Sequence, residues 1–214
     1  MKKLTLAFCS AMFLLLACNN DKAESGDPKV AGTNDTRKDE WIPIDSATAM
    51  KFWEESATPG AMHAMLAKYD GNWNYEMKWW MHDGDPNPQT YSGTCTNKMI
   101  MDGRFQQSEF KGTVWGQPFE GISICGYDNA KKVFVNTWMD NMGTAVIATE
   151  GSWDEANKTI NFEGTVRCAN GQDAETRETF KFVDDNTQLM EMYGPDLQTG
   201  KEFKSMEIKF TRAQ

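Results

Sequence analysis

The chain has 214 residues and a formal net charge of −9 at pH 7, from 31 acidic and 22 basic side chains. This length is ordinary for a single domain. Nucleic-acid binding depends on Lys and Arg contacts to phosphate, so we expect no nucleic-acid partner for a chain this acidic. The surplus of negative charge instead favours solubility.

Residues 1–17 have the pattern of a secretory signal, because Lys2 and Lys3 precede an apolar segment that is too short to span a bilayer. The segment ends in Ala17 and Cys18, and this end resembles a bacterial lipobox. The resemblance implies a lipoprotein signal peptide over residues 1–17 and lipidation of Cys18, with palmitate among the acyl chains. A plain secretory signal with an incidental cysteine is the alternative.

Residues 18–45 are predicted to be the lipidated cysteine and a disordered tether. Between Asn19 and Glu40 the only aliphatic side chain larger than Ala is Val30, and there is no aromatic residue. Such a composition is typical of disordered linkers. We therefore expect an outer-membrane or cell-envelope location, with the membrane contacted through the lipid anchor and the domain facing the periplasm or the cell surface.

Residues 46–214 are predicted to form one domain of helix plus β-barrel. The segment that begins at Ser46 suits a short amphipathic helix with Met50 and Trp53 on one face. A second helix is expected over Pro59–Lys68, with Thr58 as its N-cap, Pro59 at its first position and Gly71 after its end. Its apolar residues recur at helical spacing, so we expect it to close one end of a barrel.

From Trp73 onward the apolar period changes to two, which indicates β-strands. Short turns join the strands, and two of them repeat an aromatic-Asp-x-Ala-x-Lys pattern, after Tyr127 and after Trp153. About ten strands joined by hairpins favour an all-β fold, a single up-and-down antiparallel barrel. The predicted strands are residues 73–81, 90–101, 104–113, 119–127, 132–139, 144–153, 158–168, 175–183, 187–193 and 202–211.

Gly71-Asn72-Trp73 lies after a short helix and at the start of the first strand. This placement resembles the Gly-x-Trp signature of the calycin and lipocalin barrels. The resemblance implies that Trp73 lies across the closed end and stacks on a basic residue of the last strand, Arg212 or Lys209. Gly71, Trp73 and Arg212 are therefore expected to be structural residues.

Several further motifs together resemble an uncharacterised bacterial family, the domain of unknown function 1579. They are Thr58-Pro-Gly60, Cys95-Thr-Asn-Lys98, Pro118-Phe-Glu-Gly-Ile-Ser123, Gly126-Tyr-Asp-Asn-Ala-Lys-Lys132, Thr137-Trp-Met-Asp-Asn-Met-Gly-Thr144 and Met190-Glu-Met-Tyr193. The resemblance covers roughly residues 50–212. It implies a secreted calycin-like barrel and supplies no activity and no catalytic residues.

The barrel interior carries the main functional expectation, because the chain has 14 Met, 12 Phe and 8 Trp. A small barrel is either filled by its own side chains or holds a ligand cavity. The favoured function is non-enzymatic binding or carriage of a small apolar molecule, by a protein expected to be monomeric. The alternative is a filled barrel that recognises a protein or glycan through Trp115 and Trp138, both expected at the barrel mouth. The candidate ligand-binding residues are Tyr75, Met77, Trp79, Met99, Met101, Trp115, Trp138, Met190 and Met192.

Catalytic and metal chemistry have little support in the sequence. His63 and His82 are the only histidines, and each is expected to be a solvated or capping residue. One of them could hold haem, as in the nitrobindin-like relatives of calycin barrels, and a hydrolytic enzyme would need two carboxylates in one pocket. The sequence shows no such pair among Glu109, Glu120, Glu150, Glu191 and Glu207. We therefore expect no metal ligands, no cofactor and no catalytic residues.

Overall fold

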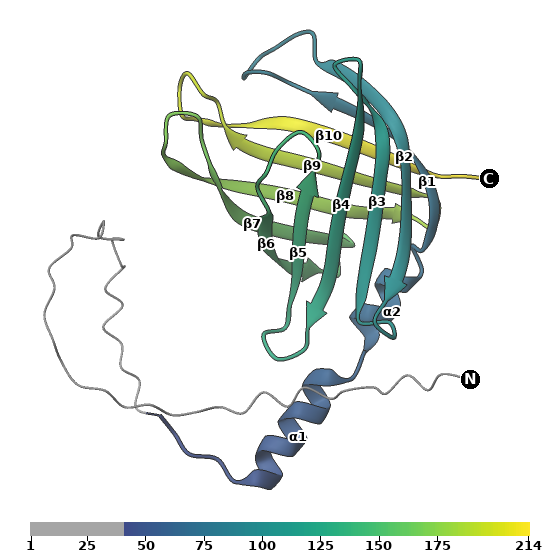
Figure 1. Ribbon diagram of the computed structural model, residues 1–214, viewed down its shortest axis with the longest axis vertical. Coiled ribbons are helices and arrows are strands. Elements are labelled where there is room, and N and C mark those ends of the chain that lie inside the picture. The colour runs from purple at the N-terminus through teal and green to yellow at the C-terminus, as the bar shows by residue number, and fades with distance from the viewer. Residues whose placement is uncertain (1–40) are drawn as a thin grey trace, which may run out of the picture. The chain divides into compact units, whose positions relative to one another are not determined.

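The computed structural model describes residues 41–214, in which ten antiparallel strands close into a barrel (Figure 1). Each strand pairs with its neighbours along the chain, and β1 pairs with β10 to close the ring. The predicted up-and-down barrel of about ten strands is confirmed. The strands are β1 (Gly71–Trp79), β2 (Gln89–Ile100), β3 (Phe105–Val114), β4 (Gln117–Asp128), β5 (Val133–Asp140), β6 (Ile147–Asp154), β7 (Thr159–Arg167), β8 (Asp173–Asp184), β9 (Thr187–Pro195) and β10 (Glu202–Arg212).

The alternation of apolar and polar residues in the sequence corresponds to side chains that point alternately to the inside and the outside of the barrel. In β1, Trp73 and Tyr75 are buried, while Asn74 and Glu76 between them are exposed. Successive side chains of a strand point to opposite faces, so most large apolar residues of the strands fall on the inner face, with exceptions such as Ile122 of β4 and Val183 of β8, which are exposed. Closure also removes the free edges that an open sheet of this length would present.

The repeated Asp turns form as the pattern predicts. Asp128 accepts backbone N–H bonds from Ala130 at 2.8 Å and Lys131 at 3.0 Å. Asp154 accepts one from Asn157 at 3.1 Å. Such bonds from an Asp to the backbone just ahead fix a tight turn. Both turns lie at the same end of the barrel, because hairpins alternate between the two ends.

Two helices precede the barrel, α1 (Ser46–Ala57) and α2 (Ala61–Ala67). The predicted start of the second helix was wrong. Thr58 belongs to the end of α1, where its hydroxyl donates to the Glu54 carbonyl at 2.7 Å, and the N-cap of α2 is Gly60. The Gly60 N–H donates to His63 Nδ1 at 3.0 Å, so His63 is a capping residue.

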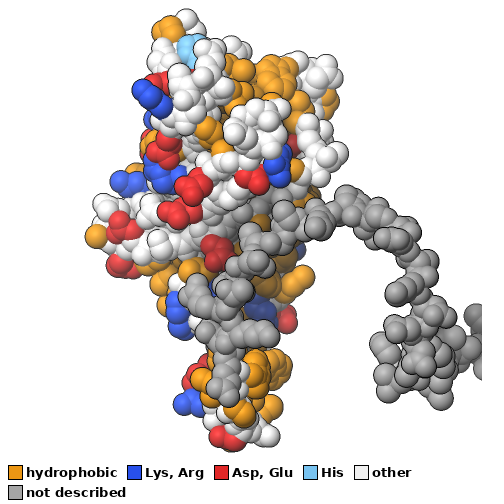
Figure 2. Space-filling model, turned by 90° about the vertical axis from the view of Figure 1, so that its left-hand side faces the viewer, with side chains coloured by type: hydrophobic (Ala, Val, Ile, Leu, Met, Phe, Trp, Pro, Cys, Tyr) orange, Lys and Arg blue, Asp and Glu red, His pale blue; other side chains and the backbone are white. Residues whose placement is uncertain are grey.

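The helix α1 exposes its apolar residues, since none of its side chains is buried. Met50 and Trp53 are 62% and 66% exposed. Figure 2 shows hydrophobic side chains at the surface at the lower end of the view, where α1 lies, and again near the opposite end of the barrel. Neither helix in the described part of the chain has the length and apolar character needed to cross a membrane.

One end of the barrel is closed by α2, which contacts β2, β3 and β4. Leu66 and His63 of α2 are buried. The carbonyl of Leu66, at the end of this short helix, accepts bonds from the Tyr69 N–H at 2.9 Å and from Gln106 Nε2 at 2.8 Å. The same amide nitrogen donates to Asp70 Oδ1 at 2.9 Å, so one side chain of β3 fixes both the helix end and the turn after it.

Trp73 is 1% exposed and fills the centre of this closed end. Its indole N–H donates to the Tyr69 carbonyl at 3.0 Å. The Arg212 guanidinium carbon lies 4.3 Å from the Trp73 ring centroid, within the range of a cation–π contact. Arg212 also donates to the carbonyls of Lys68 and Asp70, so the last strand is joined to the chain between α2 and β1.

The unit formed by residues 44–214 contains both helices and the whole barrel. The predicted signal peptide, Cys18 and the tether as far as residue 40 lie outside the described residues.

Candidate ligand-binding site

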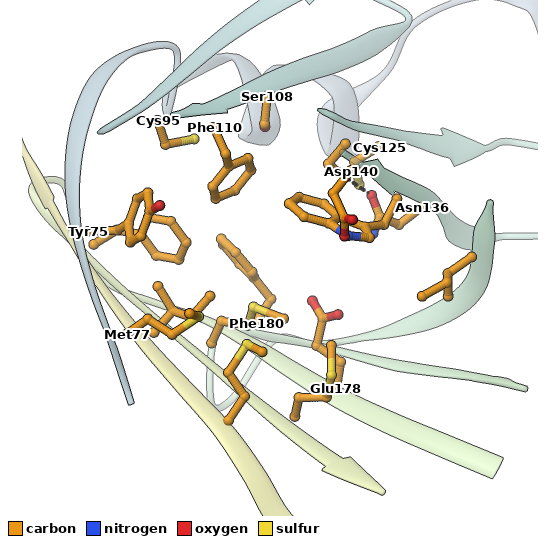
Figure 3. Close-up of a pocket in the computed structure, with 18 of the residues that line it drawn as sticks. Tyr75, Met77, Cys95, Ser108, Phe110, Cys125, Asn136, Asp140, Glu178 and Phe180 are labelled. Carbon is orange, nitrogen blue, oxygen red and sulfur yellow. Dashed lines mark hydrogen bonds between the residues drawn. The ribbon is translucent and has the colours of Figure 1, made fainter. Parts of the chain in front are cut away.

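A cavity of about 320 Å³ occupies the barrel interior (Figure 3), and its wall extends from Leu66 of α2 to Trp115 in the turn between β3 and β4. All ten strands contribute side chains to its wall. Apolar side chains make up most of the wall. The aromatic and Met residues that line it are Tyr75, Met77, Trp79, Phe110, Trp115, Phe119, Trp138, Met142, Phe162, Phe180, Met190, Met192, Met206 and Phe210.

The position of the cavity follows from side-chain length. Near α2, large side chains fill the barrel, and Trp73, Phe134, Ile160 and Gln188 are almost completely buried. Farther along, several strands present short side chains to the same interior, which do not reach the barrel axis. These short lining residues are Ser108, Ser123, Thr149 and Thr176.

Seven of the nine candidate residues line the cavity: Tyr75, Met77, Trp79, Trp115, Trp138, Met190 and Met192. Met99 lies near α2, where it packs against the buried core. Met101 lies in the turn between β2 and β3 and is 67% exposed. The structure therefore brings most of the candidates together and places Met99 and Met101 elsewhere.

The mouth of the cavity is marked by two tryptophans. Trp115, in the turn between β3 and β4, is 56% exposed and has a positive φ of 50°. Its ring centroid lies 5.2 Å from that of Trp79, in a tilted arrangement. An exposed indole beside an apolar opening is suited to contact with a ligand that enters there. Trp138, by contrast, lies in the interior against Phe110, at 5.1 Å between ring centroids.

One wall of the cavity carries polar groups from β4 and β5. Ser123 Oγ donates to Asn136 Oδ1 at 2.6 Å. Trp138 Nε1 donates to Asp140 Oδ2 at 2.7 Å, and the Met142 N–H donates to the other oxygen of Asp140 at 2.9 Å. The Asp140 carboxylate is therefore held in place by two donors.

Glu178, from β8, faces the same cavity from another wall. Its side chain is half-buried, and its carboxyl group points into the cavity (Figure 3). Burial raises the pKa of Glu178 from 4.5 to about 7, since water cannot solvate the charged form there. Within residues 41–214, the Glu178 carboxylate forms no ion pair, and burial is the cause of the shift.

The thiols of the cavity wall are unreactive, because burial disfavours their charged thiolate form. Burial raises the pKa of Cys95 to about 12, and burial together with the Glu178 charge does the same for Cys125. A thiol that stays protonated is a poor nucleophile. Cys95, Cys125 and Cys168 are all free thiols.

Basic side chains of the neighbouring strands are engaged on the outer face of the barrel. Lys204 donates to Glu191 at 3.1 Å and to Glu207 at 2.6 Å. Arg177, which precedes Glu178, pairs with Glu202 at 3.0 Å. The part of the wall formed by described residues contains the carboxylates of Asp140 and Glu178 and no Lys, Arg or His.

The two histidines lie away from the cavity. His63 is in α2 and its pKa is lowered, first by burial and then by the charge of Arg104. His82 is exposed in the loop after β1, beside a small polar depression with Asp196 and Lys201. Among residues 41–214, no group of three or more His, Cys, Asp or Glu is arranged to hold a metal ion.

Sequence reasoning missed Glu178, Asp140 and Asn136. In β8, Glu178 alternates with Phe180 and Phe182 and therefore points into the barrel with them. An acidic residue among inward-facing apolar residues was the sequence feature that could have identified it. The carboxylates that the sequence singled out all lie off the cavity wall. That β4, β5 and β8 line the same cavity becomes visible only in the closed barrel.

The comparisons with known proteins agree with this fold. No curated protein matches the chain. The crystal structure of Rv2717c from M. tuberculosis has a TM-score of 0.52 and 10% sequence identity, and the match covers 73% of this chain and 100% of that chain. A redesigned β-barrel has a TM-score of 0.37 and 11% identity over 72% of this chain and 100% of its own. At these identities the first likeness shows the fold alone, and the second carries no argument.

A family model matches residues 58–212, which is most of the chain and nearly the whole barrel domain. The resemblance drawn from the sequence motifs is confirmed over almost the same residues. The chain therefore belongs to the family described as Protein of unknown function (DUF1579).

Proposed function

We propose that this protein is a lipid-anchored protein of the cell envelope that binds or carries a small apolar molecule in its barrel. The observation that carries the proposal is the cavity of about 320 Å³, lined mainly by apolar side chains, many of them aromatic or Met. Ligand sites typically have volumes from roughly 300 to 1,000 Å³ and apolar walls with a few polar groups. A barrel filled by its own side chains would leave no such space.

Burial of an alkyl chain would supply the binding free energy. Each CH₂ group transferred from water to an apolar wall contributes about 0.8 kcal/mol. Methionine side chains adapt to ligands of different shape, and Met77, Met190, Met192 and Met206 all line the cavity. The proposal therefore predicts affinity for simple alkyl compounds without a specific head group.

Decanol is a suitable neutral probe, and Ser108→Phe is the matched test of the cavity. Ser108 lines the cavity, so a Phe ring there should occupy space that the decyl chain needs. We expect decanol binding, measured by calorimetry or by quenching of tryptophan fluorescence, to weaken by about tenfold. That factor equals the transfer free energy of roughly two methylene groups.

The control is Ser92→Phe, the same substitution at an exposed position of β2. Its affinity for decanol should stay within about twofold of that of the wild type. Equal affinities of wild type, Ser92→Phe and Ser108→Phe would place the alkyl chain outside the barrel. No binding of decanol by the wild type would contradict the proposed function.

The membrane anchor is tested separately at Cys18, which lies outside the described residues. A lipid-modified cysteine should incorporate labelled palmitate in growing cells and hold the protein in the membrane fraction. We expect Cys18→Ser to abolish labelling and to release the barrel domain, with decanol binding unchanged. Retention of label after this substitution would overturn the assignment of Cys18.

Acid–base catalysis on a bound molecule is a second candidate function. It is favoured by the presence of two carboxylates, Asp140 and Glu178, in the wall of one cavity. A group such as Glu178, whose pKa burial raises to about 7, can donate a proton near neutral pH. The mass of a ligand recovered after long incubation distinguishes the two functions, because a carrier returns its ligand unchanged.

A further inference from the structure

The cavity wall carries negative groups without positive ones, and this asymmetry restricts its ligand. Its titratable side chains are Tyr75, Cys95, Cys125, Asp140 and Glu178. None of these is basic, and Arg177 of β8 and Lys204 of β10 pair with acidic groups that do not line the cavity.

The two carboxylates differ in what they already bind. Asp140 accepts two hydrogen bonds from its own strand and the adjoining loop, from Trp138 and Met142. Glu178 lies between the apolar partners Phe162 of β7 and Met192 of β9. Within the described part of the chain it has no cation beside it. A charge that has been removed from water without a partner is unfavourable for the free protein.

We propose that the molecule carried in the cavity is an amphiphile with a primary ammonium group at its polar end, and that Glu178 is the binding partner of that group. The inference rests on the proposed function, since it assigns a ligand class to the same cavity. An ammonium group is a compact cation with three hydrogen-bond donors. Bonds between such donors and a carboxylate are about twice as strong as bonds between neutral groups.

The surroundings of Glu178 offer acceptors for the remaining donors. In Figure 3 the Glu178 carboxyl group points into the cavity, toward the side on which Asn136 and Asp140 lie. Both residues line the cavity and carry side-chain oxygen atoms. The rest of the wall is apolar and suits the hydrocarbon part of the ligand.

The same wall disfavours fatty acids. A carboxylate head group in this cavity would lie near Glu178 and Asp140 and would meet no Lys or Arg side chain of the described wall. Like charges at close range in a poorly solvated site repel strongly, and this repulsion is fullest above about pH 7, where Glu178 is ionised. An alcohol would bind through its alkyl chain and one neutral hydrogen bond, with an intermediate affinity.

Binding of the ammonium group should release a proton. In the free protein burial raises the pKa of Glu178 to about 7, so the group is mostly protonated at pH 6. A neighbouring cation favours the carboxylate form and lowers that pKa again. The thiols of Cys95 and Cys125 remain neutral at this pH, since burial raises the pKa of each to about 12. Glu178 is therefore the source of the released proton.

The test compares decylamine, decanol and decanoate, below their micellar concentrations, by calorimetry at pH 6 in two buffers of different ionisation enthalpy. For the wild type we expect decylamine to bind about tenfold or more tightly than decanol at pH 6, and decanoate to bind weakest when the comparison is repeated at pH 8, where Glu178 is ionised. Glu178→Gln should remove the preference for the amine and leave decanol within about twofold. The wild type should release about one proton with decylamine, and Glu178→Gln should release none.

Glu175→Gln is the control, because Glu175 is exposed on the same strand and is changed by the same substitution. It should keep the amine preference and the proton release. Binding of all three compounds without an amine preference overturns the ligand assignment and leaves the proposed function standing. An amine preference that survives in Glu178→Gln likewise overturns the ligand assignment and leaves the proposed function standing. Failure of all three compounds to bind overturns both.

Discussion

Substitution Trp73→Ala is expected to lower the free energy of unfolding by about 3–5 kcal/mol, the range for large aromatic residues removed from a core. Trp73 is 1% exposed, and its removal leaves a void between α2 and the barrel. The Tyr69 carbonyl loses the indole N–H that it accepts at 3.0 Å. The Arg212 guanidinium loses the ring that lies 4.3 Å from it.

Equilibrium unfolding in urea measures this loss, and Trp115→Ala is the matched control. Both variants lose one indole, but Trp115 is 56% exposed at the mouth and should cost about 1 kcal/mol or less. A Trp73→Ala protein as stable as the Trp115→Ala protein would refute the structural role of Trp73. Ligand binding should respond in the opposite order, because Trp115 lines the cavity and Trp73 does not.

The sequence was sufficient for the fold, because strand direction and side-chain phase are local properties. In β1 the alternation of large and polar residues predicted which side chains face inward, and Trp73 and Tyr75 are buried accordingly. The turns after Tyr127 and Trp153 form through their Asp side chains. The start of α2 was missed because Thr58 can cap the helix that follows it or end the one that precedes it, and its hydroxyl bonds backward to Glu54.

The candidate site was harder to predict from the sequence than the fold, because a cavity depends on how strands from different parts of the chain combine. Met99 and Met101 have the residue type of ligand contacts, but β2 carries them toward the closed end and into the turn beyond it. Trp138 comes shortly before Gly143 in the sequence, yet its ring packs inside the barrel over Gly121, where an added Cβ would lie 2.5 Å from the indole. Glu178 could be recognised as a candidate site residue only once the neighbouring strands were seen to enclose it in the cavity.

The two ends of the barrel have different roles: the end closed by α2 contributes to stability, and the end that contains the cavity is available for binding. Large side chains near α2 provide the contacts that hold the barrel together, so the interior can be left open where short side chains line it. Gly93 allows this arrangement at the boundary, because an added Cβ there would lie 2.6 Å from the Tyr75 ring. The tyrosine therefore packs against the β2 wall and leaves the centre of the barrel open.

Substitution Glu178→Gln is expected to stabilise the ligand-free protein at alkaline pH. The pKa of Glu178 rises from 4.5, its ordinary value in an unfolded chain, to about 7 in the fold. The folded state therefore binds the proton more tightly than the unfolded state, and the contribution of protonated Glu178 to stability is complete below pH 4.5. It is lost as the pH rises through about 7, and the full loss by about pH 8 corresponds to about 3 kcal/mol.

The measurement is the difference in unfolding free energy between wild type and Glu178→Gln as a function of pH, because other titrating groups such as His63 cancel in that difference. The difference should be small near pH 4.5 and should grow in favour of Glu178→Gln up to about pH 8. Glu175→Gln should follow the wild type throughout, since its side chain is exposed. A constant difference across this range would mean that water or a rearranged side chain solvates Glu178. Saturating decylamine should stabilise the wild type more than Glu178→Gln, because the ammonium group would compensate the charge that the free protein leaves unpaired.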